Sequence, residues 1–146
     1  MLKLFKGLRG CAFVVLASTV GSSASADSDI PRKQEAQLVD RVEARWEALG
    51  NSDYVATYDF QSPSYRAVFT QEMYASQFSS TLERRLTSVE ILNYDAAAAV
   101  ASVAVGVMSR PVKQTSAASA AIQAKPVIVV EQWILRNNEW WFSVVK

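Results

Sequence analysis

Residues 131–142 read EQWILRNNEWWF, and this stretch decides the fold. β-Branched and aromatic residues dominate on both sides of Asn137-Asn138, which predicts two strands joined by a tight turn. Asparagine tolerates the positive φ that a two-residue hairpin turn needs. We therefore expect a strand from Val127 to Arg136, apolar on both faces, and its partner strand from Glu139 to Val145.

The sequence before this hairpin predicts two more strands. Leu86 to Tyr94 is rich in β-branched residues, and Asp95 marks a turn after it. Ala96 to Arg110 alternates valine with small residues, but its four initial alanines would also suit a helix, so we expect strand from Val100 onward. Residues 111–125 are polar and predict a loop, within which residues 117–122 could form a short helix. The four strands would form an antiparallel meander.

The first part of the chain has a helical pattern. Apolar residues recur on one face of a helix expected between Pro31 and Leu49. They are Leu38, Val42, Trp46 and Leu49. Asp29 is expected to cap this helix, and Gly50 to end it in the left-handed conformation.

Shorter helical segments are expected next. Asn51 or Ser52 would cap a helix over Asp53–Asp59, a turn begins at Ser62-Pro63, and Thr70 would cap a helix over Gln71–Phe78. Helical structure should end near Arg85. Helices followed by a meander define an α+β fold, in which N-terminal helices pack on one face of a strongly curved antiparallel sheet.

The N-terminus carries the three parts of a secretory signal peptide. Lys3, Lys6 and Arg9 form a positive region, an apolar stretch covers residues 11–20, and Ala24-Ser25-Ala26 offers a cleavage site. The apolar stretch is about half of the roughly 20 residues that a membrane span needs, although an uncleaved anchor is the alternative. We expect residues 1–26 to be removed and residues 27–146 to form one periplasmic or secreted domain without a stable membrane anchor. The intact mass of the exported protein tests this cleavage.

Composition narrows the chemistry of this domain. Cleavage would remove the only cysteine and three of the 15 basic residues, which leaves 12 basic against 14 acidic residues and a net charge of −2. The chain has no histidine, so it lacks the commonest general base and metal ligand. Without a basic patch, thiolate or imidazole, we expect no nucleic-acid partner, no metal and no cofactor.

The stretch RVEARWEALGNSDY, residues 41–54, and the hairpin of residues 131–142 resemble the opening helix and the last hairpin of the nuclear transport factor 2-like (NTF2-like) superfamily. The segment SPSYR, residues 62–66, is similar to one found in many exported members. The resemblance implies a cystatin-like cone, in which three helices close one side of a bent sheet and leave a pocket at the wide end. Members include ketosteroid isomerases, polyketide cyclases, dehydratases and a nuclear import factor, so the fold alone does not define an activity.

The resemblance also allows the family's chemistry to be tested. Its steroid isomerases place a catalytic tyrosine where this chain has Arg45 or Trp46. They place a general-base aspartate near Phe69-Thr70, where the nearest carboxylate is Glu72. The dehydratases use histidine, which this chain lacks. Because neither pattern is matched, we predict no catalytic residue and expect a protein that is not an enzyme.

Six residues are candidates for lining a pocket: Trp46, Tyr58, Tyr65, Phe69, Glu131 and Trp133. A buried carboxylate beside tyrosine hydroxyls could act as a general base, and Asp59 and Glu131 are the carboxylates considered for this role. In the competing interpretation Glu131 faces outward or lies at a sheet edge, Asp59 ends a helix, and the aromatic residues fill the core.

The two adjacent tryptophans of the last strand bear on assembly. Trp140 and Trp141 must point to opposite faces of a regular strand, so one would face away from the helices. Because both faces of the preceding strand are also apolar, we expect a homodimer through the sheet. The leading hypothesis is an exported, non-catalytic binding or interaction domain with a pocket for a small apolar ligand. The alternatives are a small-molecule enzyme of the isomerase or cyclase type and a component of an envelope assembly.

Overall fold

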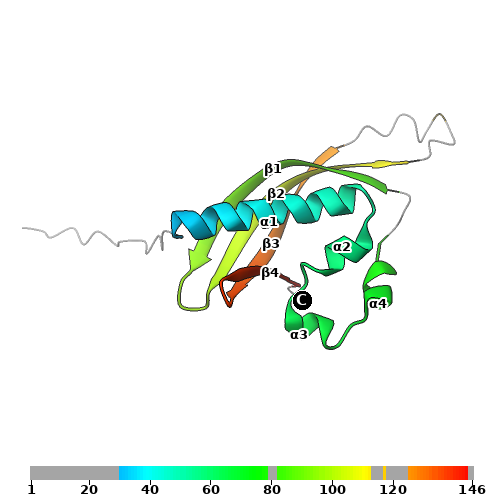
Figure 1. Ribbon diagram of the computed structural model, residues 1–146. Coiled ribbons are helices and arrows are strands. Elements are labelled where there is room, and N and C mark those ends of the chain that lie inside the picture. Colours follow the sequence, from blue (N-terminus) through cyan, green and yellow to red (C-terminus); the bar gives the residue numbers. More distant parts are fainter. Residues whose placement is uncertain (1–29, 79–81, 113–116, 118–124, 145–146) are drawn as a thin grey trace, which may run out of the picture.

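A computed structural model describes residues 30–78, 82–112, 117 and 125–144 (Figure 1). Within these residues the helices are α1 (Arg32–Gly50), α2 (Tyr54–Tyr58), α3 (Pro63–Arg66) and α4 (Gln71–Ala75). The strands are β1 (Leu82–Asp95), β2 (Val100–Pro111), β3 (Lys125–Arg136) and β4 (Glu139–Ser143). They pair in the order β1-β2-β3-β4, each antiparallel to its neighbour. The α+β class and the meander are thereby confirmed. The expected signal peptide, the cap Asp29 and most of the expected 117–122 helix lie outside the described residues.

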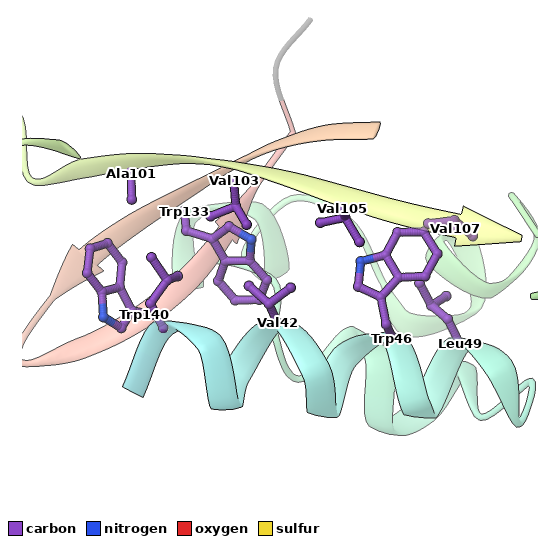
Figure 2. Close-up of a cluster of buried hydrophobic side chains, with 10 residues drawn as sticks. Val42, Trp46, Leu49, Ala101, Val103, Val105, Val107, Trp133 and Trp140 are labelled. Atoms are coloured by element: carbon purple, nitrogen blue, oxygen red, sulfur yellow. The ribbon is translucent and has the colours of Figure 1, made fainter. Parts of the chain in front are cut away.

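The core lies between α1 and the sheet, because the apolar stripe predicted on α1 is buried against β2. Figure 2 shows Val42, Trp46 and Leu49 pointing from α1 toward the strands. Val103 and Val105 of β2 meet them and are inaccessible to solvent. Each fully buried aliphatic side chain contributes about 1.5–3 kcal/mol, so this layer holds the long helix on the sheet. The short helices follow beyond the C-terminal end of α1 (Figure 1).

The end of α1 differs from its prediction. Gly50 is the last residue of the helix and does not adopt positive φ, which falls instead at Ser52 with φ of 58°. Glycine is needed at this position for another reason, because a Cβ there would lie 2.9 Å from the carbonyl oxygen of Arg84. The helix end therefore lies directly against the backbone of β1.

Side-chain caps begin the short helices. Asp53 accepts a hydrogen bond of 3.0 Å from a backbone N–H of α2, so this residue, and not Asn51 or Ser52, caps the helix. The predicted cap Thr70 is confirmed by its bond of 3.3 Å from the backbone of α4. Caps of this kind contribute about 1 kcal/mol each, which helps helices of four or five residues to form.

β1 begins four residues earlier than predicted, at Leu82 instead of Leu86, and its first residues pair with the end of β2. The charged run Glu83-Arg84-Arg85 masks the strand in the sequence, because edge strands carry charges that interrupt apolar alternation. β2 begins at Val100, as predicted. The alanines before it form a turn, in which Asp95 accepts two backbone hydrogen bonds of 2.9 and 3.0 Å.

The last hairpin confirms the predicted turn, since Asn137 and Asn138 have φ values of 52° and 63°. Trp140 points into the core and is 1% exposed. Trp141 is half-buried, with the guanidinium carbons of Arg41 and Arg66 at 5.4 and 5.1 Å from its ring centre. The second indole is therefore flanked by arginines and is not an open apolar surface.

Candidate ligand-binding site

A cavity of about 300 Å³ lies between the C-terminal half of α1, β3 and the end of β4. Its apolar walls include Leu49, Phe78, Val129 and Phe142. Three charged side chains, Arg45, Arg84 and Glu131, also line it, together with Trp46. The cavity thus combines a mostly apolar surface with a small number of charges.

Arg45 and Glu131 form a buried ion pair at this cavity. Nη1 of Arg45 donates to Oε1 of Glu131 at 2.7 Å, and the two side chains are 6% and 3% exposed. Two indole N–H groups complete the site, because Trp46 donates to Oε1 and Trp133 to Oε2, each at 3.0 Å. Burying two charges costs several kcal/mol per ion unless further hydrogen bonds satisfy them, and the indoles supply such bonds.

This arrangement limits what Glu131 can do chemically. A general base must offer a free lone pair to the substrate proton. Both carboxylate oxygens of Glu131 already accept hydrogen bonds from the protein, and no tyrosine hydroxyl bonds to them among the described residues. Glu131 does not face outward or lie at an edge: it points inward from β3, which is flanked by β2 and β4.

Arg45 is the residue of this site that local sequence pattern does not reveal. Its guanidinium carbon lies 3.8 Å from the ring centre of Phe142, so the cation is stacked on an aromatic face as well as paired with Glu131. Arginine is rarely buried, and an arginine beside an apolar stripe is therefore expected at the surface. The available signal was the glutamate inside an apolar strand, since a buried carboxylate needs a cation.

Three of the six pocket candidates belong to this site. Trp46 and Glu131 line the cavity, and Trp133, which is fully buried, holds Glu131 from within the core. Asp59 does not join them: its side chain is 71% exposed and lies 3.8 Å from Arg66. The structure therefore brings together tryptophans and a carboxylate, without the tyrosines that acid–base catalysis was expected to use.

The other three candidates form a separate aromatic cluster around Tyr74. Tyr58 donates to the carbonyl of Phe69 at 2.6 Å and has its ring centre 5.6 Å from that of Tyr74. Tyr65 packs against both Phe69 and Tyr74, with ring centres 4.7 and 6.2 Å away. These rings join the short helices to one another and do not line the cavity.

Tyr74 of this cluster lies near Gln61 and Arg45 inside the fold. Gln61 is fully buried, and both polar atoms of its amide lack a hydrogen-bond partner among the described residues. Burial raises the pKa of the Tyr74 hydroxyl, while the Arg45 charge and contacts with Gln61 and Arg45 oppose the shift. These contacts fall short of standard hydrogen-bond geometry. Tyr74 is thus held in its neutral form beside the cationic side of the site.

Two further features concern metal binding and membrane insertion. In residues 30–78, 82–112, 117 and 125–144, no three His, Cys, Asp or Glu side chains lie close enough to hold a metal ion. Across the same residues, no helix has both the length and the apolar character required to cross a membrane.

Solved structures identify the fold. An NTF2-like protein of unknown function from Pseudomonas putida KT2440 is 11% identical and matches with a TM-score of 0.53 over 77% of this chain and 84% of that chain. A putative dehydratase from the NTF2-like family of Streptomyces avermitilis is 12% identical, with a TM-score of 0.52 over 77% of this chain and 93% of that chain. No family model matches the sequence, and no curated protein sequence matches it significantly. The chain therefore has the cone-shaped NTF2-like fold, as its resemblance implied.

Proposed function

We propose that the protein is an exported, non-catalytic binding domain that holds a small, largely apolar ligand in the cavity beside Arg45 and Glu131. The cavity itself carries the proposal. Its apolar walls and few charged groups are typical of small-molecule sites, and a volume of about 300 Å³ is at the lower end of their range. Export rests on the N-terminal sequence alone.

The hydrogen bonds of Glu131 favour binding over catalysis. An enzyme of the isomerase or cyclase type would need a carboxylate free to take a substrate proton. Three of the roughly four lone-pair sites of the Glu131 carboxylate already accept bonds from Arg45, Trp46 and Trp133, which leaves little of it for a substrate. Asp59 is largely exposed and lies outside the cavity lining, so it offers no enclosed alternative.

A cavity-filling variant tests the proposed binding. Val129 lines the cavity, and Val129→Phe adds a ring to its wall. We expect binding of 4-phenylbutan-1-ol to weaken by roughly tenfold or more, about 1.4 kcal/mol, because the added ring occupies volume that the probe needs. Tryptophan fluorescence reports the titration, since Trp46 lines the same cavity.

Val68→Phe is the matched control, because Val68 is 70% exposed and lies outside the cavity lining. This variant should bind the probe like the unaltered protein. Equal affinities for the Val129→Phe and Val68→Phe variants would contradict the assignment of the cavity as the binding site.

The proposal includes a homodimer that forms through the sheet face opposite α1. Ile128 and Val130 alternate along β3 with Val129, and their side chains are 64% and 59% exposed; Val130, unlike Ile128, is also among the residues that line the cavity. Neighbouring exposed apolar side chains of this kind mark interaction surfaces. Because arginines flank Trp141, these two residues carry the dimer proposal in its place.

Sedimentation velocity tests the dimer. The unaltered protein is expected to sediment as a dimer at high micromolar concentration, and the double variant Ile128→Lys/Val130→Lys as a monomer. Val55→Lys/Val68→Lys serves as the control, because Val55 and Val68 are 62% and 70% exposed and lie outside the sheet. A monomeric unaltered protein, or a dimer that survives the Ile128→Lys/Val130→Lys change, would argue against this interface.

A further inference from the structure

The charges around the cavity do not cancel. Arg45 and Glu131 neutralise each other at 2.7 Å, and the two indole N–H groups occupy the carboxylate further. Arg84 is the remaining charged residue of the lining. The residues that line the cavity therefore carry one net positive charge beside apolar walls.

Arg84 enters the cavity from β1. Its guanidinium carbon lies 5.9 Å from the ring centre of Phe78, which also lines the cavity, so the cation lies next to an aromatic wall. Its only hydrogen bond among the described residues is a long one of 3.5 Å to the carbonyl of Leu82. Glu43, Glu47 and Glu83 line an adjoining groove with Arg84, yet none forms an ion pair with it within the described ranges.

We propose that the ligand is an amphipathic monoanion, with a carboxylate bound by Arg84 and an apolar body held between Leu49, Phe78 and Val129. This inference rests on the proposed function and specifies the ligand's chemical class. A guanidinium matches a carboxylate with two parallel hydrogen bonds, and such charge-assisted bonds are about twice as strong as neutral ones. A cationic ligand lacks a comparable partner in the cavity lining, because Glu131 is the carboxylate there and its oxygens already accept three bonds from protein donors.

Three probes with the same body separate the alternatives: 4-phenylbutyrate, 4-phenylbutan-1-ol and 4-phenylbutylammonium. Tryptophan fluorescence titrations should give the tightest binding for the carboxylate, weaker binding for the alcohol and the weakest for the amine. Arg84→Gln is expected to weaken binding of 4-phenylbutyrate by about tenfold or more, because hydrogen bonds to charged groups contribute about 1.5–3 kcal/mol. The same variant should leave the affinity for the alcohol nearly unchanged.

Arg85→Gln is the matched control, since it removes the same charge from the next residue, which is exposed and outside the cavity lining. Arg84→Lys should restore part of the carboxylate affinity. If the alcohol binds as tightly as the carboxylate, or if Arg84→Gln and Arg85→Gln weaken binding equally, the anion assignment is wrong while the binding cavity stands. If none of the three probes binds, the proposed function fails as well.

Discussion

Replacing Arg45 with methionine is expected to lower the free energy of unfolding by about 3–5 kcal/mol. The change leaves the Glu131 carboxylate buried without its cation, with only the indole N–H groups of Trp46 and Trp133 as partners. An uncompensated buried charge is among the costliest single changes in a protein interior. Urea unfolding measures the loss, provided that the dependence on denaturant stays unchanged.

A second substitution separates charge from packing. In Arg45→Met/Glu131→Gln no charge remains, and the amide oxygen can accept from one of the two indoles, while the NH2 group takes the place of the oxygen that accepts from the other. We expect the double variant to recover part of the stability lost in Arg45→Met, because the buried charge is gone while one indole N–H loses its acceptor, and the double-mutant cycle then gives the coupling between the two residues.

A surface ion pair with the same distance between nitrogen and oxygen provides the control. Arg110 and Glu83 are also 2.7 Å apart, but their side chains are 59% and 48% exposed. Exposed ion pairs contribute little because water screens both charges, so Arg110→Met should leave stability almost unchanged. Equal losses in Arg45→Met and Arg110→Met would show that burial of the Arg45–Glu131 pair has no energetic consequence.

Trp140→Ala is expected to destabilise the protein by about 3–5 kcal/mol, the usual cost of truncating a buried aromatic side chain to alanine. Trp140 is 1% exposed, and its ring packs edge-on against Tyr94 with 5.9 Å between the ring centres. Its indole also donates to the carbonyl of Gln34 at 2.9 Å, which ties β4 to the first turn of α1. Urea unfolding followed by far-ultraviolet circular dichroism measures the loss.

Trp141→Ala, at the neighbouring residue, is expected to cost clearly less. Trp141 is half-buried and interacts mainly with Arg41 and Arg66, and cation–π contacts at exposed sites contribute about 0.5–1 kcal/mol each. The comparison holds residue type and strand constant while burial changes. A Trp141→Ala variant as unstable as Trp140→Ala would contradict the difference in burial between the two rings.

The elements that local periodicity specifies could be predicted from the sequence. The stripe of α1, the alternating valines of β2 and the Asn137-Asn138 turn each repeat or interrupt a pattern over a few residues. The meander followed from the order of these elements, since strands that are consecutive in the chain usually lie side by side in the sheet.

Long-range contacts decided the details that local patterns predicted wrongly. Glycine is needed at position 50 for space and not for conformational freedom. A side chain there would meet the carbonyl oxygen of Arg84, more than 30 residues later in the chain. β1 begins at Leu82 because the end of β2 pairs with a charged segment that has no apolar alternation of its own.

The sequence by itself thus determined an NTF2-like arrangement of helices and strands, because side-chain periodicity fixes which face of each element is buried. Only the tertiary structure decided the role of Glu131. Arg45 and Glu131 lie 86 positions apart in the chain, and each is a residue type that water usually surrounds. The packing of α1 on β3 removes that water, pairs the two charges with each other and brings two indole donors to Glu131. It leaves Arg84 as the unbalanced charge of the cavity lining.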